Sequence, residues 1–136
     1  MVHELELQRE VIIEGSVPDE EMPRYYSAAD AFVFAAVDEP WGLVVLEAMA
    51  CGLPVVVPST GGPNESVQEG VTGLQVDGRD PQEYAEKLET ILRNSRLARR
   101  IGKAARSRIQ REFDLTRTVD SLEAFYLQIL ETHLKG

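Results

Sequence analysis

The sequence predicts one α/β domain built on a parallel sheet of about four strands, followed by C-terminal helices. Four short apolar runs lie at residues 11–15, 31–37, 54–58 and 73–76. Stretches in which apolar side chains recur at helical spacing separate these runs. Short strands that are apolar on both faces and alternate with helices are typical of a parallel sheet with helices packed against it. We therefore expect a single domain over residues 1–136.

The first half of the chain supplies three of the strands and two helices. "VIIEG" at residues 11–15 is a short β-branched run that ends at a glycine. Residues 17–30 have helical spacing, and Pro23 is compatible with a helix because it falls in the first turn. After the strand at 31–37, "WGLVVLEAMACG" is long enough for three helical turns, and Gly52 is placed to end them. "PVVVP" then predicts the valine-rich third strand.

The second half begins with a glycine-rich turn and becomes helical. "TGGPNE" leads through a polar stretch to the short fourth strand. The helix at 80–95 begins with Asp80 at the N-cap, a proline at the first helical position, and Glu83 placed to complete a capping box. Two more helices follow, one at 96–113 and one from about Leu115. The helix at 96–113 has a basic face made of Arg96, Arg99, Arg100, Lys103, Arg106, Arg108 and Arg111.

The charge and cysteine content argue against several classes of protein. A net charge of -9 disfavours a nucleic-acid binder, which needs an excess of lysine and arginine. The single cysteine, Cys51, cannot form an internal disulfide, and without a histidine nearby it is expected to pack rather than to act as a nucleophile. The N-terminal residues lack an apolar leader, and no apolar run approaches ~20 residues, so we expect a cytoplasmic protein.

Two glutamates, Glu39 and Glu47, flank the apolar stretch after the second strand. Because a buried unpaired carboxylate is costly, we expect that both point out of the core at its rim or that a polar group meets them there. Ligands of open parallel sheets bind there, where strands end and helices begin. The N–H groups of Gly42 and Leu43 would face phosphate oxygens, and Glu47 would accept two hydrogen bonds from a vicinal diol such as a ribose. The competing interpretation is that Glu39 caps the helix and Glu47 is merely an exposed helix residue.

The string "EPWGLVVLEAMACGLPVVVPSTGGPNE" favours the first interpretation. It resembles the donor-binding signature of retaining GT-B glycosyltransferases of family 4, written roughly E-P-[FW]-G-L-x-x-x-E-A-M-A-x-G-x-P-V-V and then G-G-x-x-E. "VPDEEMPRYYSAADAFVF" before it and "EGVTGLQVDGRDPQEYAEKLETIL" after it resemble the same family. The resemblance implies a Rossmann-like sheet that binds a nucleotide diphosphate sugar without a bound metal or other cofactor.

The resemblance also implies roles for individual residues. Glu39 matches the glutamate that contacts the transferred sugar, which makes it the catalytic candidate. Gly42 and Leu43 match the turn that faces the diphosphate or the sugar, and Glu47 matches the glutamate that holds the ribose hydroxyls. Gly61 and Gly62 match the turn beside the donor and are further donor-binding candidates. Trp41 is a donor-binding candidate because of its position beside Glu39, as a wall of the pocket, and core packing is its competing interpretation.

Relative to the family pattern, this sequence resembles only the later part of the second of two domains. We expect the acceptor domain and the first two strands of the donor domain to be missing, together with the arginine and lysine that the family uses on the diphosphate. The chain alone is therefore expected to have no transferase activity. The alternative function is a non-catalytic α/β module that folds and self-associates.

An incomplete sheet also predicts a homo-oligomer. The strand at 11–15 would lose its neighbours in the family fold. It can pair directly with the strand at 31–37, which leaves one apolar face of the sheet bare, or with another copy of the chain. The last helix carries a further apolar stripe without a partner. We expect an assembly built on the sheet face, on a swapped strand or on the last helix.

Overall fold

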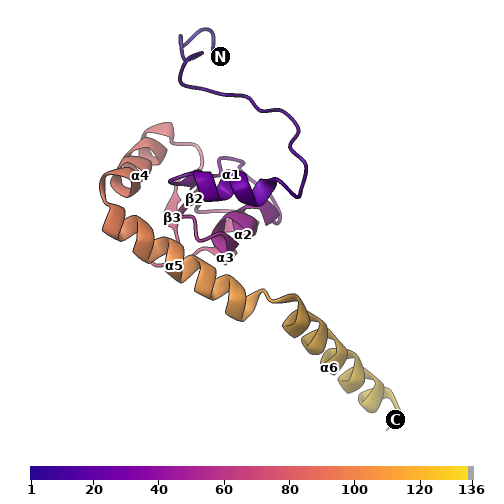
Figure 1. Cartoon of the computed structure of the whole chain (residues 1–136). Helices are drawn as coiled ribbons and strands as arrows, with labels where there is room; N and C mark the ends of the chain where they lie inside the picture. The colour runs from indigo at the N-terminus through magenta and orange to yellow at the C-terminus, as the bar shows by residue number, and fades with distance from the viewer. Residues whose placement is uncertain (135–136) are drawn as a thin grey trace.

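The computed structural model describes residues 1–134 as a layered α/β body with an irregular N-terminal segment and a projecting C-terminal helix (Figure 1). The elements of the body are α1 (Met22–Ala28), β1 (Phe32–Val33), α2 (Leu43–Ala50), β2 (Val55–Pro58), α3 (Gly62–Ser66), β3 (Leu74–Val76), α4 (Pro81–Arg93) and α5 (Ser95–Glu112). The projecting helix is α6 (Leu115–Leu134). Strands alternate with helices along the body, so the predicted α/β class is confirmed.

The sheet has three parallel strands in the order β1-β2-β3. Phe32 pairs with Val55, and Val56 pairs with Leu74 on its other side. The connections from β1 through α2 to β2 and from β2 through α3 to β3 run in the same direction across the sheet. Because crossovers between parallel strands are right-handed, α2 and α3 lie on the same face of the sheet. The parallel pairing predicted for residues 31–37, 54–58 and 73–76 is confirmed, although each strand is shorter than its apolar run.

The prediction of a fourth strand at residues 11–15 is wrong. This segment has no regular structure, and the side chains of Ile12 and Ile13 are each 80% exposed. The N–H groups of Phe32 and Phe34 donate to carbonyl oxygens of the β2 segment, and no described residue pairs with the other edge of β1. A β-branched run forms a strand only when a neighbouring strand takes its hydrogen bonds.

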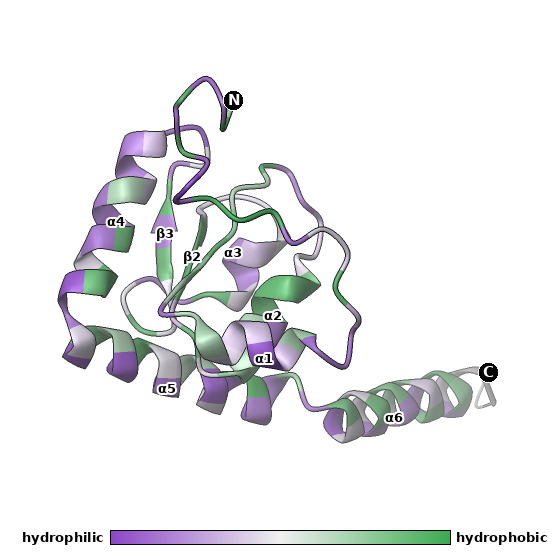
Figure 2. Ribbon diagram, turned by 45° about the horizontal axis from the view of Figure 1, so that its top comes forward, coloured by the Kyte–Doolittle hydropathy of each residue, from purple (hydrophilic) through white to green (hydrophobic). Residues whose placement is uncertain are grey.

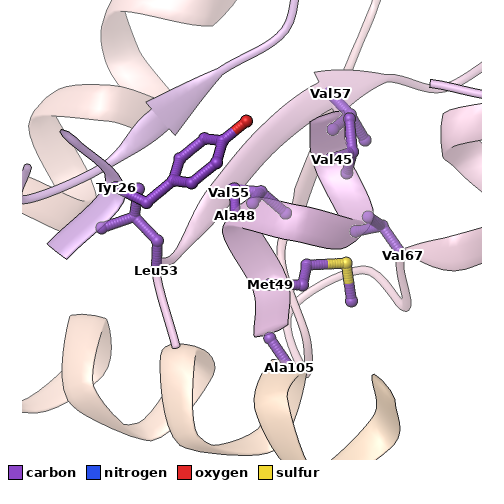
Figure 3. Packing of buried hydrophobic residues seen from close by; sticks show 9 residues of the cluster. All are labelled: Tyr26, Val45, Ala48, Met49, Leu53, Val55, Val57, Val67 and Ala105. Atoms are coloured by element: carbon purple, nitrogen blue, oxygen red, sulfur yellow. The ribbon is translucent and has the colours of Figure 1, made fainter. Parts of the chain in front are cut away.

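Helices cover both faces of the sheet (Figure 2). The valines of β2 alternate between two buried clusters, and all three are 0% exposed. On one face, Val55 and Val57 pack with a cluster completed by Tyr26, Val45, Ala48, Met49, Leu53, Val67 and Ala105 (Figure 3). On the other face, Val56 packs with Leu74, Val76, Ile91 and Ile101. The expectation of a bare sheet face is therefore wrong, because α4 and the first half of α5 cover it.

The start of α4 confirms one part of the predicted capping box and corrects the other. The Asp80 carboxylate accepts hydrogen bonds from the N–H groups of Gln82 at 2.9 Å and Glu83 at 3.2 Å, as an N-cap residue does. The Glu83 carboxylate does not return to the N-cap. It accepts from the N–H of Asp77 at 2.6 Å, so it ties α4 to the turn that follows β3.

The helix α6 extends away from the body (Figure 1). Its side chains are exposed from Leu115 to Thr132. The exposed apolar residues on it include Leu115, Val119, Leu122, Phe125, Tyr126, Leu127 and Leu130. Among the helices that the structure describes, none is both long and apolar enough to cross a membrane.

Candidate functional site

The loops that follow β1 and β2 lie against each other at the carboxyl end of the sheet. The N–H of Gly62 donates to the carbonyl oxygen of Glu39 at 2.8 Å. A Cβ atom at Gly62 would lie 1.9 Å from the carbonyl oxygen of Pro40, and one at Gly61 would lie 3.0 Å from that of Glu39. Only residues without a side chain permit this approach. The structure therefore brings together the two glycines and Glu39.

Two residues with left-handed backbone conformations flank the segment that carries Glu39. Asp38 before it has φ 65°, and Gly42 after it has φ 61°. Gly42 is also the N-cap residue of α2, and a Cβ atom there would lie 2.6 Å from Cγ of Pro63. No side chain among the described residues, that of Glu39 included, hydrogen-bonds the first turn of α2. The interpretation of Glu39 as a helix cap is therefore wrong, and the first-turn N–H groups have no capping side chain.

Glu39 lines an open hollow at the start of α2. The hollow has a volume of about 440 Å³, and its lining is Phe34, Glu39, Trp41, Gly42, Leu43 and Val44. Trp41 is 74% exposed and Leu43 is 63% exposed. Neither side chain belongs to a buried cluster, so core packing does not account for these two apolar residues. Four of the predicted site residues therefore surround one hollow.

Glu47 lines a different hollow, between α1 and α2. Its volume is about 420 Å³, and its lining is Asp19, Met22, Pro23, Tyr26, Glu47, Ala50 and Cys51. The Glu47 side chain lies at the rim of the core, as predicted, and its Oε2 accepts a hydrogen bond from the Tyr26 hydroxyl at 2.9 Å. The hollows of Glu39 and Glu47 share no lining residue, and the first turn of α2 contributes to one of them.

The electrostatic character of the two hollows is acidic. Their linings contain Glu39, Glu47 and Asp19, and neither lining includes a lysine or an arginine. Within the part of the chain that the structure describes, no three histidine, cysteine, aspartate or glutamate side chains are grouped to hold a metal ion. Positive polarity near the hollows comes from the backbone N–H groups at the start of α2.

Two side chains near the site have contacts that the sequence analysis missed. Tyr26 is buried in the core, but its hydroxyl reaches Glu47; the available signal was that a buried tyrosine hydroxyl needs a partner. The side chain of Arg108, on the basic face of α5, is only 13% exposed. Its Nε lies 3.0 Å from Oε2 of Glu112, with which it forms an ion pair. Its Nη2 donates to the carbonyl oxygen of Glu65 at 3.3 Å, which links α5 to α3 behind the glycine turn.

Comparison with known proteins agrees with the family resemblance of the sequence. Residues 1–108 match the family described as "Glycosyl transferases group 1". The D-inositol 3-phosphate glycosyltransferase of Geodermatophilus obscurus is 41% identical over 110 residues, which cover 81% of this chain and 24% of that protein. The chain therefore spans about a quarter of the length of this curated relative.

Solved structures share the fold. Sucrose-phosphate synthase from Thermosynechococcus elongatus superposes with a TM-score of 0.90 and 35% identity, covering 96% of this chain and 33% of that one. HepE of Anabaena in complex with UDP superposes with a TM-score of 0.85 and 30% identity, covering 93% of this chain and 34% of that one. HepE is also known in complex with UDP-glucose. The chain thus belongs to the glycosyl transferases group 1 family, the family-4 enzymes of GT-B fold, and has the structure of part of their C-terminal domain.

Proposed function

We propose that this chain, as part of the C-terminal domain of a GT-B glycosyltransferase, holds a nucleotide diphosphate sugar beside the first turn of α2. The observation that carries the proposal is the pair of hollows, one lined by Glu47 and the other by Glu39, with uncapped N–H groups at the start of the helix. Ribose hydroxyls donate to Glu47, phosphate oxygens face Gly42 and Leu43, and the sugar lies against Glu39 and Trp41. The complexes of HepE with UDP and UDP-glucose support a uridine nucleotide as the first ligand to test.

Glu39 is the catalytic candidate in this arrangement. Glycosyl transfer passes through a transition state in which positive charge develops at the anomeric carbon, and a fixed carboxylate stabilises such charge. The backbone of Glu39 is held by the hydrogen bond from Gly62, and Gly61 and Gly62 allow this close packing. The two glycines therefore act by holding the loop that presents Glu39.

Calorimetric titration with UDP, UDP-glucose, and GDP- and ADP-sugars tests the assignment. The substitution Glu47→Ala should weaken nucleotide binding by about 1.5–3 kcal/mol, because it removes hydrogen bonds to a charged acceptor. Glu39→Ala should weaken UDP-glucose binding and leave UDP binding nearly unchanged. Glu123→Ala, which removes an exposed carboxylate on α6, is the matched control. Equal affinities of wild type and Glu47→Ala for each nucleotide would contradict the ribose assignment.

We propose further that the chain alone binds its donor weakly and does not transfer sugar. Both hollows are open, and their linings carry carboxylates without a cation to face the diphosphate. Transfer also needs an acceptor held against the anomeric carbon, and such positioning can account for about 7–11 kcal/mol of the barrier. Incubation of the purified chain with UDP-glucose and candidate acceptors should give no glycosylated product. Turnover by the chain alone would contradict this proposal.

The exposed apolar residues support self-association as a second property. Residues 11–15 and α6 both present large apolar side chains to solvent. Exposed apolar area of this kind favours association. Because helices cover both faces of the sheet, the proposed contacts are limited to these two segments. Light scattering at tens of micromolar should show a homo-oligomer, and a monomer at that concentration would exclude it.

A further inference from the structure

The ring of Tyr26 has a fixed place at the edge of the core. Tyr26 is 6% exposed, and its ring meets that of Phe32 edge-on, with centroids 5.8 Å apart and an interplanar angle of 70°. Leu53 and Val55 belong to the same buried cluster (Figure 3). In Figure 3 the hydroxyl lies at the far end of the ring from Leu53. A ring confined in this way presents its hydroxyl at one position.

That hydroxyl is the hydrogen-bond partner of an otherwise exposed carboxylate. It donates to Oε2 of Glu47 at 2.9 Å, across 21 residues of sequence. Among the described residues, no other side chain hydrogen-bonds or ion-pairs with the Glu47 carboxylate. Burial, followed by the hydrogen bond and the charge of Glu47, raises the pKa of Tyr26. The hydroxyl therefore stays protonated and donates a hydrogen bond to Glu47.

We infer that Tyr26 is a positioning residue, which holds the Glu47 carboxylate in the orientation that receives a ribose diol. An exposed glutamate samples several rotamers, and a ligand that needs one of them loses affinity in selecting it. The bond from Tyr26 occupies one lone pair of Oε2 and limits rotation of the carboxylate. Oε1 and the second lone pair of Oε2 remain for the two hydroxyls. This inference rests on the proposed ribose role of Glu47.

A purely structural role for Tyr26 makes a different prediction. If the bond only joined α1 to α2, its loss would lower stability and would weaken binding of ribose and deoxyribose nucleotides alike. If it positions Glu47, its loss reduces the preference for ribose. Tyr84 offers a matched control, because this half-buried tyrosine donates from α4 to the carbonyl oxygen of Phe34, also at 2.9 Å. Tyr84→Phe removes a bond of equal length that does not involve Glu47.

The test measures discrimination between ribose and deoxyribose. UDP, GDP and ADP, and the 2′-deoxy form of each, are titrated into wild type, Tyr26→Phe, Tyr84→Phe, Glu47→Ala and the double variant Tyr26→Phe/Glu47→Ala. For the base that binds most tightly, Tyr26→Phe should lower the ratio of the deoxyribose Kd to the ribose Kd by about two- to tenfold. Tyr84→Phe should leave that ratio unchanged. In the Glu47→Ala background, Tyr26→Phe should have no further effect on the ratio.

The outcomes distinguish failure of this inference from failure of the proposed ribose role of Glu47, on which it rests. If wild type does not discriminate between ribose and deoxyribose for any base, the ribose role of Glu47 is wrong and the inference fails with it. If wild type and Glu47→Ala differ but Tyr26→Phe discriminates as wild type does, only the role of Tyr26 is overturned. Circular dichroism establishes that each variant folds. Should Tyr26→Phe not fold, Glu47→Asp breaks the same bond from the other side; an unchanged ratio would overturn the inference.

Discussion

Two β-branched runs in this chain have similar composition and opposite structures. "PVVVP" at residues 54–58 forms the central strand, which pairs with β1 on one side and β3 on the other, and in which Val55, Val56 and Val57 are each 0% exposed. "VIIEG" at residues 11–15 forms no strand, and its two isoleucines are 80% exposed. Intrinsic β-propensity is as high in the second run as in the first.

This contrast shows that a β-branched run forms a strand where neighbouring segments pair with it and cover it. The central run follows α2 and precedes α3, and both helices pack on it, while α4 covers its other face. Burial of a valine side chain stabilises a fold by about 1.5–3 kcal/mol, but only where a second surface removes it from water. Residues 11–15 have no such surface among the described residues. Three pairs of substitutions and one deletion test how far this contrast extends.

The largest effect is expected from a charge placed in each run. Val56→Asp buries a carboxylate without a partner in the apolar cluster beneath α4 and α5, and should lower the free energy of unfolding by about 4 kcal/mol or more. Ile13→Asp should change it by no more than about 0.5 kcal/mol. Urea denaturation followed by circular dichroism measures both. Comparable destabilisation by the two changes would break the contrast between the runs.

The second-largest difference in stability is expected from replacing a glycine of the body and a glycine of the N-terminal segment by alanine. Gly62→Ala places a Cβ atom 1.9 Å from a backbone oxygen of Pro40, so the two loops must separate, at a cost of about 1–3 kcal/mol. Gly15 has φ +74°, but nothing lies within 4 Å of its Cβ position, and the unpaired segment can adjust its backbone. Gly15→Ala should therefore leave the thermal midpoint nearly unchanged. A stable Gly62→Ala variant would show that the loops do not need this packing.

Removing a helix N-cap should give a smaller difference in stability between α4 and α6. Asp80→Ala removes the N-cap of α4 and should lower the free energy of unfolding by about 1 kcal/mol. The carboxylate of Asp114 accepts from the N–H of Arg117 at 3.2 Å at the start of α6. Asp114→Ala should reduce helical content slightly and leave the main unfolding transition in place. Equal shifts of that transition would mean that α6 unfolds together with the body.

Removal of α6 should have the smallest effect on stability. A chain ending at Phe113 loses side chains that are exposed from Leu115 to Thr132, so its free energy of unfolding should change by no more than about 0.5 kcal/mol. The same deletion should reduce self-association in light scattering, because an exposed apolar surface is removed. A large loss of stability would show that α6 packs against the body in solution.

Features that depend on local chemistry can be predicted from the amino-acid sequence. Apolar runs between helical segments predict the three paired strands, and apolar spacing predicts α1, α2, α4 and α5. In contrast, α3 lies in a segment that the sequence predicts as a glycine-rich turn. Asp80 as an N-cap follows from its own side chain and the residues just after it. The motif from Glu39 to Glu65 indicates the family, which the match over residues 1–108 confirms.

Contacts between residues that are distant in sequence depend on how the helices and strands pack. No local pattern distinguishes residues 11–15 from a strand, because pairing depends on an edge elsewhere in the chain. The covering of the second sheet face by α4 and α5 likewise follows from their packing. Glu83 bonds to Asp77 instead of its own N-cap because the end of β3 lies within reach. Tyr26 and Glu47 meet because two helices pack side by side, and sequence spacing does not specify that contact.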